Sequence, residues 1–340
     1  MRKRTAVISL ISLLLASTLL SGCSAGNGSG EVYSDTAFML DTVVSVKIYG
    51  VPEDEARAAV DAAFSEIAFC EDLLSSDISG NGIDRLERNA GSAYTELDGG
   101  AVYVLEKAIE YAELTSGAFD PTVGPVVALW NIRNGSGYVP TEEERAAAAA
   151  LVDYSKVLFD GDGRVKLADA GMSVNLGAIA KGYIADRVKN LLSGMGIEHA
   201  VISLGGNVLA FGGKPDGSDF IIGIQDPFGP TGEIVATVAV RDMSVVSSGD
   251  YERYFEQDGV RYHHIMDPFT GAPADSGLSG VTILSEKSID GDALSTAVFV
   301  LGRNEGLELI ESLDGVECVL IGSGGERTVS SGLKDNIVFR

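Results

Sequence analysis

The order of apolar and polar residues predicts a chain of mixed strands and helices. Over residues 38–49, apolar and polar positions alternate up to Gly50, which predicts a half-buried strand. Residues 52–74 begin with Pro and acidic side chains and continue with apolar residues at helical spacing, so they predict a helix, and 100–114 predict a second one. The segment 75–91 between them is rich in Ser, Asn and Gly, so we expect a loop.

The second half of the chain continues this alternation. Thr141 and the glutamates after it predict a capped surface helix over 141–151, and a Gly-Asp-Gly turn predicts an extended pair over 157–167. A helix is expected over 179–194. Further strands are predicted over 200–203, 220–225, 234–240, 244–247, 261–265, 280–284, 318–321 and 327–330, and further helices over 291–300 and 306–312. With no internal repeat and no linker of shifted charge, the pattern favours one composite domain, which we place at 35–340.

The N-terminus predicts export. Arg2, Lys3 and Arg4 precede an apolar stretch, Ala6–Leu20, which is shorter than the roughly 20 residues of a membrane-spanning helix. Leu20-Ser21-Gly22-Cys23 follows and resembles a bacterial lipobox, so residues 1–22 are expected to be a signal peptide.

Cleavage before Cys23 would leave a diacylglyceryl-modified thiol, with residues 23–34 as a flexible, Gly- and Ser-rich tether. The protein is then expected on the extracytoplasmic face of the cell membrane, held by its lipid. The alternative is an ordinary secreted protein with a cysteine at that position.

The composition narrows the possible chemistry. The chain of 340 residues carries 49 acidic and 25 basic side chains, a formal net charge of −24, so nucleic-acid binding through phosphate contacts is not expected. Three cysteines and three histidines leave little material for a disulfide framework or for a zinc site. We expect Cys70 and Cys318 to be buried thiols. Catalysis would have to come mainly from carboxylates, hydroxyls and backbone groups.

Four segments are too dense in Gly, Pro and functional groups to be ordinary loops. They are SGAFDPTVGP at 116–125; NLGAIAKGY at 175–183 with LGGN at 204–207; SGDY at 248–251 continuing to YHHIMDP at 262–268 and Thr270-Gly271; and DGDALST at 290–296.

Each segment allows a chemical and a structural interpretation. Asp292 and Thr296 lie four residues apart on a predicted helix, so their oxygens share one face and suit Mg²⁺, although a helix cap would explain them too. Lys181 stands at a predicted helix start beside glycines, where it and free N–H groups can hold pyrophosphate, or where a structural turn is formed. His264 can be a general base or a structural histidine.

Taken together and in this order, the four segments resemble the ApbE family of FAD:protein FMN transferases from Met39 to about Gly302. The resemblance implies an α+β fold, with a T-fold-like core of mainly antiparallel sheet flanked by helices. It also implies an exported, Mg²⁺-dependent enzyme that cleaves FAD and attaches FMN through a phosphoester to a Thr or Ser of exported acceptor flavoproteins, releasing AMP.

The resemblance further implies roles for individual residues. Asp292 and Thr296, the backbone carbonyl of Ala178, and Ser295 beside them match the metal site, and Asp292 and His264 match the catalytic pair, with His264 as the base that activates the acceptor hydroxyl. The positions that match FAD contacts are Met39, Asp77, Ala118, Phe119, Asp120, Asn175, Lys181 and Ile265.

One position departs from the family pattern. Asp77 stands where transferases commonly have a Tyr that stacks on the flavin, a contact worth on the order of 1 kcal/mol. Its loss leaves open a FAD pyrophosphatase that releases FMN and AMP with water as the acceptor. A lipoprotein that only binds FAD is the third possibility, against which the intact Asp292, Thr296 and His264 argue.

Overall fold

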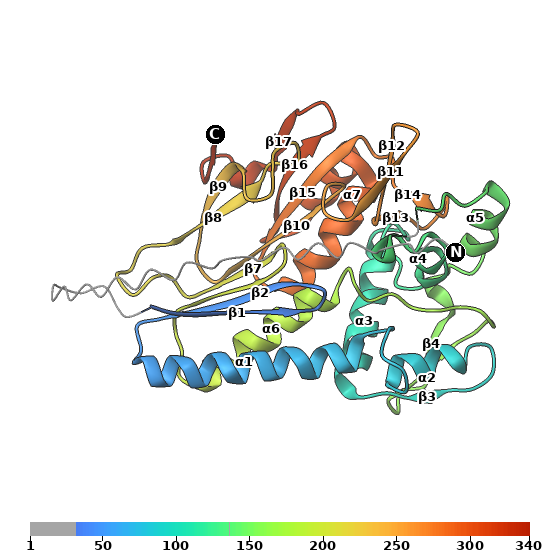
Figure 1. Ribbon diagram of the computed structural model, residues 1–340, viewed down its shortest axis with the longest axis horizontal. Coiled ribbons are helices and arrows are strands. Elements are labelled where there is room, and N and C mark those ends of the chain that lie inside the picture. Colours follow the sequence, from blue (N-terminus) through green and yellow to red (C-terminus); the bar gives the residue numbers. More distant parts are fainter. Residues whose placement is uncertain (1–31, 136) are drawn as a thin grey trace, which may run out of the picture.

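In the computed structural model, which describes residues 32–135 and 137–340, an antiparallel sheet of eight strands organises the molecule (Figure 1). Its strand order is β1-β2-β6-β7-β10-β15-β16-β17, and every neighbouring pair is antiparallel. The strands are β1 (Val32–Met39), β2 (Thr42–Tyr49), β6 (Ala200–Leu204), β7 (Asn207–Phe211), β10 (Met243–Gly249), β15 (Leu278–Ser285), β16 (Glu317–Gly322) and β17 (Arg327–Val329).

Helices cover one face of this sheet, and a smaller sheet covers part of the other. On the helical face, α1 (Glu53–Leu74) and α6 (Ala180–Gly194) pack below β1, β2 and β6, and α7 (Ser288–Glu311) packs against β10 and β15. Successive side chains of a strand point to opposite faces of the sheet, so each strand contributes to a hydrophobic core on both faces. In β10, Val246 points toward α7, while Val245 belongs to the cluster on the opposite face. That opposite cluster is completed by β8 (Phe220–Gln225), β9 (Ile234–Val240) and β18 (Ile337–Phe339).

The remaining elements surround the helical layer. They are α2 (Gly82–Arg88), β3 (Thr95–Glu96), α3 (Gly99–Leu114), α4 (Gly124–Trp130), η1 (Ile132–Asn134), α5 (Glu142–Ala149), η2 (Tyr154–Lys156), β4 (Val157–Phe159), β5 (Arg164–Leu167), β11 (Tyr254–Gln257), β12 (Val260–His263), β13 (Met266–Asp267), β14 (Ala272–Pro273) and η3 (Ser331–Leu333). The hairpin β11–β12 is fixed on α4 by stacked rings: Tyr262 lies 5.4 Å from Trp130 and 5.1 Å from Phe255, centroid to centroid.

The α+β prediction and most predicted elements are confirmed, with several differences. The strand expected over 38–49 is two strands, because Leu40 and Asp41 adopt left-handed backbone conformations and turn the chain. The first of them begins at Val32, so residues 32–34 of the expected tether belong to the sheet. The expected loop 75–91 contains α2, which Asn81 caps and whose Ile83 and Leu86 are buried.

The two helices expected near the C-terminus form one element, α7, interrupted at Gly302 (φ 79°, ψ −177°). Cys70 and Cys318 are free, buried thiols, as predicted. The signal peptide, Cys23 and the tether up to residue 31 lie outside the described residues. Among residues 32–135 and 137–340, no helix has both the length and the apolar character needed to cross a membrane.

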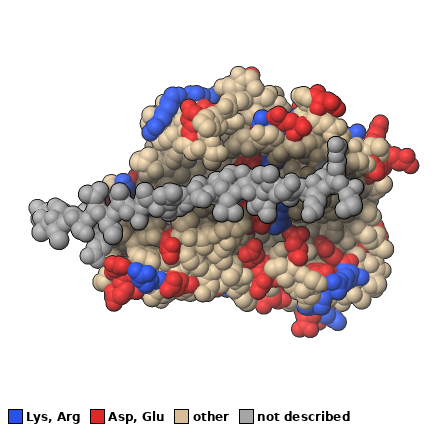
Figure 2. Space-filling model, viewed as in Figure 1, with Lys and Arg blue, Asp and Glu red and all other residues tan. Residues whose placement is uncertain are grey.

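Charged side chains are spread over the surface. On the face shown in Figure 2, acidic side chains are distributed around the rim with some basic side chains among them, rather than gathered into one patch. The net charge of −24 therefore describes a solvated surface more than a particular binding site.

Candidate functional site

The segments singled out in the sequence converge at one end of the large sheet. The turns β1–β2 and β6–β7 lie side by side there, because antiparallel pairing places Leu204 opposite Val44. Contact between the turns requires glycine: a Cβ on Gly205, whose φ is +59°, would lie 2.1 Å from Thr42 Oγ1. The GGN segment thus serves to bring two hairpin turns together.

Helices α6 and α7 cross closely below this end of the sheet. A Cβ on Gly182 would lie 2.3 Å from the carbonyl oxygen of Ser288, so only glycine permits the crossing. At this point the Gly182 N–H donates to Asp292 Oδ2 over 2.9 Å. The crossing therefore carries Asp292 of α7 to the first turn of α6.

Lys181 and Asp292 form the charged centre of the site. The Asp292 side chain is buried, and Lys181 Nζ lies 3.5 Å from its Oδ1 while donating to the Gly177 carbonyl over 3.0 Å. A buried carboxylate needs such partners, because its charge has lost the stabilisation of water. Asp292 Oδ2 is thus engaged by the backbone, and Oδ1 faces the lysine.

The donor set around Asp292 fits Mg²⁺. Oδ1 accepts no hydrogen bond from the backbone, Thr296 follows four residues later on the same side of α7, and Ala178 lies in the turn that leads into α6. All of these donors are oxygens, and Mg²⁺ binds through one or two carboxylates plus substrate phosphates and water. Within the described ranges no three His, Cys, Asp or Glu side chains gather for a metal, so an all-protein cage is not formed there.

Ser295, expected beside the metal, is engaged elsewhere. Its hydroxyl donates to the Asp292 carbonyl over 2.9 Å and shares a 2.8 Å hydrogen bond with the hydroxyl of Ser248 on β10. These contacts attach α7 to the sheet, so the Ser295 hydroxyl holds the helix in place.

His264 follows β12 and approaches the same centre. Its N–H donates to the Arg253 carbonyl over 3.0 Å, and its Nδ1 is buried without a hydrogen-bond partner. Burial, reinforced by the positive charges of Arg253 and Lys181, lowers the pKa of His264 to about 3. With its pKa this far below the ordinary histidine value, the His264 ring is neutral and weakly basic at neutral pH.

The segment 118–121 is joined to the loop before α6. The Asn175 N–H donates to the Pro121 carbonyl over 2.7 Å, and Asn175 Oδ1 accepts the Gly177 N–H over 3.0 Å. Asp120 accepts from the Thr122 N–H (2.7 Å), the Thr122 hydroxyl (2.6 Å) and the Tyr154 N–H (3.1 Å), and its burial raises its pKa.

Other residues expected at FAD turn their side chains into the core. Ala118, Phe119 and Ile265 are buried, and Met39, the last residue of β1, packs against the main core. Direct contact from the three buried residues would therefore come mainly from their backbone groups.

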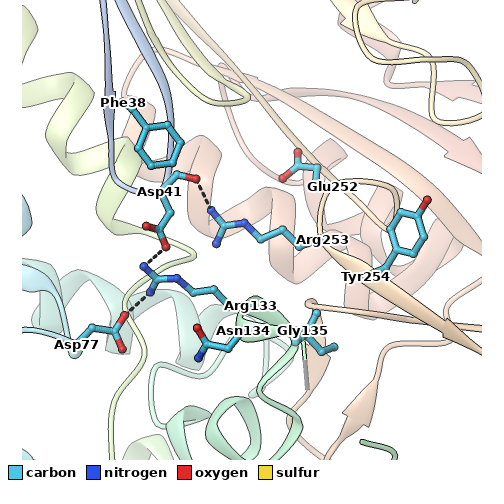
Figure 3. A pocket seen from close by; sticks show the side chains of 10 residues that line it. Phe38, Asp41, Asp77, Arg133, Asn134, Gly135, Glu252, Arg253 and Tyr254 are labelled. Carbon is cyan, nitrogen blue, oxygen red and sulfur yellow. Dashed lines mark hydrogen bonds and ion pairs between the residues drawn. The ribbon is translucent and has the colours of Figure 1, made fainter. Parts of the chain in front are cut away.

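A cavity of about 870 Å³ opens between the β1–β2 turn, the loop after α1, the segment around η1 and the start of β11 (Figure 3). Arg133 spans it, pairing with Asp41 on one side and Asp77 on the other, while the Arg253 guanidinium donates to the Asp41 carbonyl over 3.1 Å. Glu252 also lines the cavity and interacts electrostatically with Lys181 and Asp292, so cavity and charged centre adjoin. A volume of this order suits a large cofactor-like ligand.

The structure thus brings together some predicted residues and adds others. Lys181, Asp292 and His264 share one electrostatic environment, and of the predicted residues Asp77 lines the cavity. The sequence reasoning missed the cavity residues Asp41, Arg133, Glu252 and Arg253. Asp41 lies two residues after the predicted contact Met39, and Glu252 and Arg253 directly follow the SGDY segment. The sequence around these three positions therefore carried a signal, whereas no predicted segment lies beside Arg133.

Comparisons with known proteins show which family and fold the chain shares. The model of the ApbE family matches residues 40–320. The FAD:protein FMN transferase of Treponema pallidum is 36% identical over 336 residues, 94% of this chain and 93% of the relative. That of Klebsiella pneumoniae is 34% identical over 88% of this chain and 92% of its own. The solved structure of the ApbE protein from Thermotoga maritima superposes with a TM-score of 0.83 at 32% identity, covering 90% of this chain and 99% of that one. For the flavin transferase ApbE from Vibrio cholerae, the TM-score is 0.80 at 26% identity, with the same coverage.

The lowered pKa of His264 gives a direct prediction. In the free protein the ring should stay neutral from pH 5 to pH 8, because protonation would add a charge beside Lys181 and Arg253 in a buried place. Proton NMR of the ring C–H signals, assigned with a His264→Gln variant, checks this among only three histidines. A midpoint near the ordinary value of about 6.5 for His264 would contradict the burial and the charges described.

Proposed function

The chain belongs to the ApbE family, and from this premise we propose that it is a Mg²⁺-dependent FAD:protein FMN transferase. The proposed reaction attaches FMN through a phosphoester to a Thr or Ser hydroxyl of an exported acceptor flavoprotein and releases AMP. The names of the relatives and the shared fold favour this transfer over a protein that only binds FAD.

The observation that carries the proposal is the charged centre at the edge of the cavity. Asp292 is only 2% exposed, yet it is held at the α6–α7 crossing with Lys181 3.5 Å away. A buried carboxylate paired with a lysine next to a cavity is the kind of site that holds a charged ligand. The pyrophosphate of FAD, together with a divalent cation, matches both charges.

In this assignment, Asp292, the Thr296 hydroxyl and the Ala178 carbonyl would hold Mg²⁺. When bound, Mg²⁺ would supply electrophilic stabilisation of the pyrophosphate oxygens. Lys181, at the start of α6, would bind the pyrophosphate through its charge.

The chemical step exchanges the phosphoanhydride bond of the FAD pyrophosphate for a phosphoester bond to the acceptor. The acceptor hydroxyl oxygen bonds to the FMN phosphorus, the bond from that phosphorus to the bridging oxygen breaks, and AMP leaves with the electron pair. His264 receives the hydroxyl proton. An anionic pyrophosphate nearby opposes the charges of Lys181 and Arg253, so its binding would raise the pKa of His264 toward a useful range.

Hydrolysis of FAD is a second candidate reaction, favoured by the position of Asp77. This side chain is exposed, lines the cavity and pairs with Arg133, so a polar and hydrated wall stands where transferases commonly have a Tyr. Water that reaches the cavity would compete with the acceptor hydroxyl and give free FMN and AMP.

We also propose attachment to the extracytoplasmic face of the cell membrane through an acylated Cys23. The proposal rests on the basic and apolar N-terminus and on the Leu-Ser-Gly-Cys segment. An acidic chain is not attracted to anionic membrane lipid, so the acyl chains on Cys23 would have to supply the attachment.

The transfer is tested with purified protein, FAD, Mg²⁺ and an exported flavoprotein that offers an acceptor Thr. We expect one added FMN per acceptor by mass spectrometry, and loss of transfer by about 100-fold or more in Asp292→Asn, which keeps the shape but removes the charge. Glu305→Gln, at an exposed position further along the same helix, is the matched control and should stay within about twofold of wild type. No flavin on the acceptor would refute the transferase. FMN released without an acceptor would establish hydrolysis.

The anchor is tested by cell fractionation. Wild type should partition into the detergent phase and carry a diacylglyceryl mass on Cys23, whereas Cys23→Ser should lose both, because a lipid at this thiol is the proposed attachment. Membrane retention of Cys23→Ser, with no lipid found on the wild type, would contradict the proposal.

A further inference from the structure

Helices α6 and α7 both begin without a cap of their own. The residues that precede them, Ile179 and Lys287, make no side-chain hydrogen bond to the first turn. The first N–H groups of a helix have no partner within the helix, and at a buried helix start they need acceptors from elsewhere.

Each helix takes its acceptor from the other. Asp292 of α7 accepts the Gly182 N–H in the first turn of α6. In return, Asp186 of α6 accepts the first N–H groups of α7: its Oδ1 lies 2.9 Å from Ser288 N and its Oδ2 lies 3.0 Å from Ile289 N. We call these two carboxylates, Asp186 and Asp292, the reciprocal caps.

The reciprocal caps fix the position of Asp292. The start of α7 is bound at Ser288 and Ile289, and Asp292 stands about one helical turn later. Asp186 is on the helix that also carries Lys181. Lys181 and Asp292 are therefore placed by one junction, although Asp186 does not line the large cavity at all.

The surroundings of Asp186 disfavour the ionised form of its side chain. Burial raises its pKa to about 6, so the environment favours the neutral form more than water does. The two N–H donors oppose this effect. A carboxylate that is ionised in such a place at neutral pH loses part of the stabilisation that its two hydrogen bonds supply to the fold. The orienting effect of these hydrogen bonds on α7 is therefore of interest beyond their effect on stability.

From the reciprocal caps we infer that Asp186 is a positioning residue for the divalent-cation site: it fixes the first turn of α7 so that Asp292 Oδ1 faces the ligand. The inference rests on the proposed function, because it takes Asp292 as a metal ligand. Loss of Asp186 would leave two buried N–H groups unpaired and let the first turn of α7 shift. Partners that orient metal ligands typically change metal affinity by about 10–100-fold when removed.

The experiment measures Mn²⁺ binding to the full chain by electron paramagnetic resonance of free Mn²⁺, with no acceptor present. We expect the Mn²⁺ dissociation constant to rise about 10-fold in Asp186→Asn, which keeps one acceptor oxygen, and further in Asp186→Ala, which keeps none. The affinity for FAD without metal should be unchanged. If Asp186→Ala does not fold, the Asn variant carries the test.

Asp98→Ala is the matched control, since Asp98 caps a different helix, α3, by accepting the Gly100 N–H over 2.8 Å. It should lower the thermal midpoint without changing Mn²⁺ affinity. The inference is overturned if the Asp186→Asn variant has a lower thermal midpoint but the same Mn²⁺ dissociation constant as wild type. It is also overturned if the wild-type protein binds no Mn²⁺. Altered Mn²⁺ affinity in a protein that transfers no FMN would refute the proposed function and leave Asp186 in its role.

Discussion

The crossing of α6 and α7 is the contact on which the rest of the site depends. Gly182 permits a close approach of the two helices that a side chain at this position would block. Asp292 and Asp186 supply the hydrogen-bond acceptors that the starts of both helices lack. Hydrogen bonds between the hydroxyls of Ser244 and Ser288 and of Ser248 and Ser295 also attach α7 to the sheet. The position of Asp292 is therefore fixed relative to both the sheet and α6. The site is thus placed by helix starts and strands rather than by loops, which favours a fixed geometry.

Much of the site could be predicted from the sequence, because several of its functional residues lie close together along the chain. Asp292 and Thr296 share a helix face by spacing alone, and Lys181 stands at a helix start flanked by glycines. Most elements followed from periodicity, whereas the fold class followed from the resemblance to the ApbE family. Helix α2 was missed because its seven residues are too few for a periodic signal among turn-forming neighbours. The turn at Leu40–Asp41 was missed because it contains no glycine, although both residues have positive φ.

What the sequence could not show was contact between distant segments. The pairs of Arg133 with Asp41 and with Asp77 join three separate segments, and no spacing predicts them. Nor could the pKa of His264 be read from the sequence, since burial lowers it most and the charges of Arg253, His263 and Lys181 add to that effect. The net charge of −24 is equally uninformative about the site, where Lys181 lies 3.5 Å from Asp292.

The central claim is that Asp292 binds a divalent cation beside the FAD pyrophosphate. Its most direct test is the anomalous difference density of Mn²⁺ in crystals grown with ADP, which carries the same pyrophosphate without the flavin. The account predicts one peak bonded to Asp292 Oδ1, with the Thr296 hydroxyl and the Ala178 carbonyl near it and ADP oxygens completing the shell. A peak on other residues, or ADP bound beside Lys181 with no Mn²⁺ at Asp292, would contradict it.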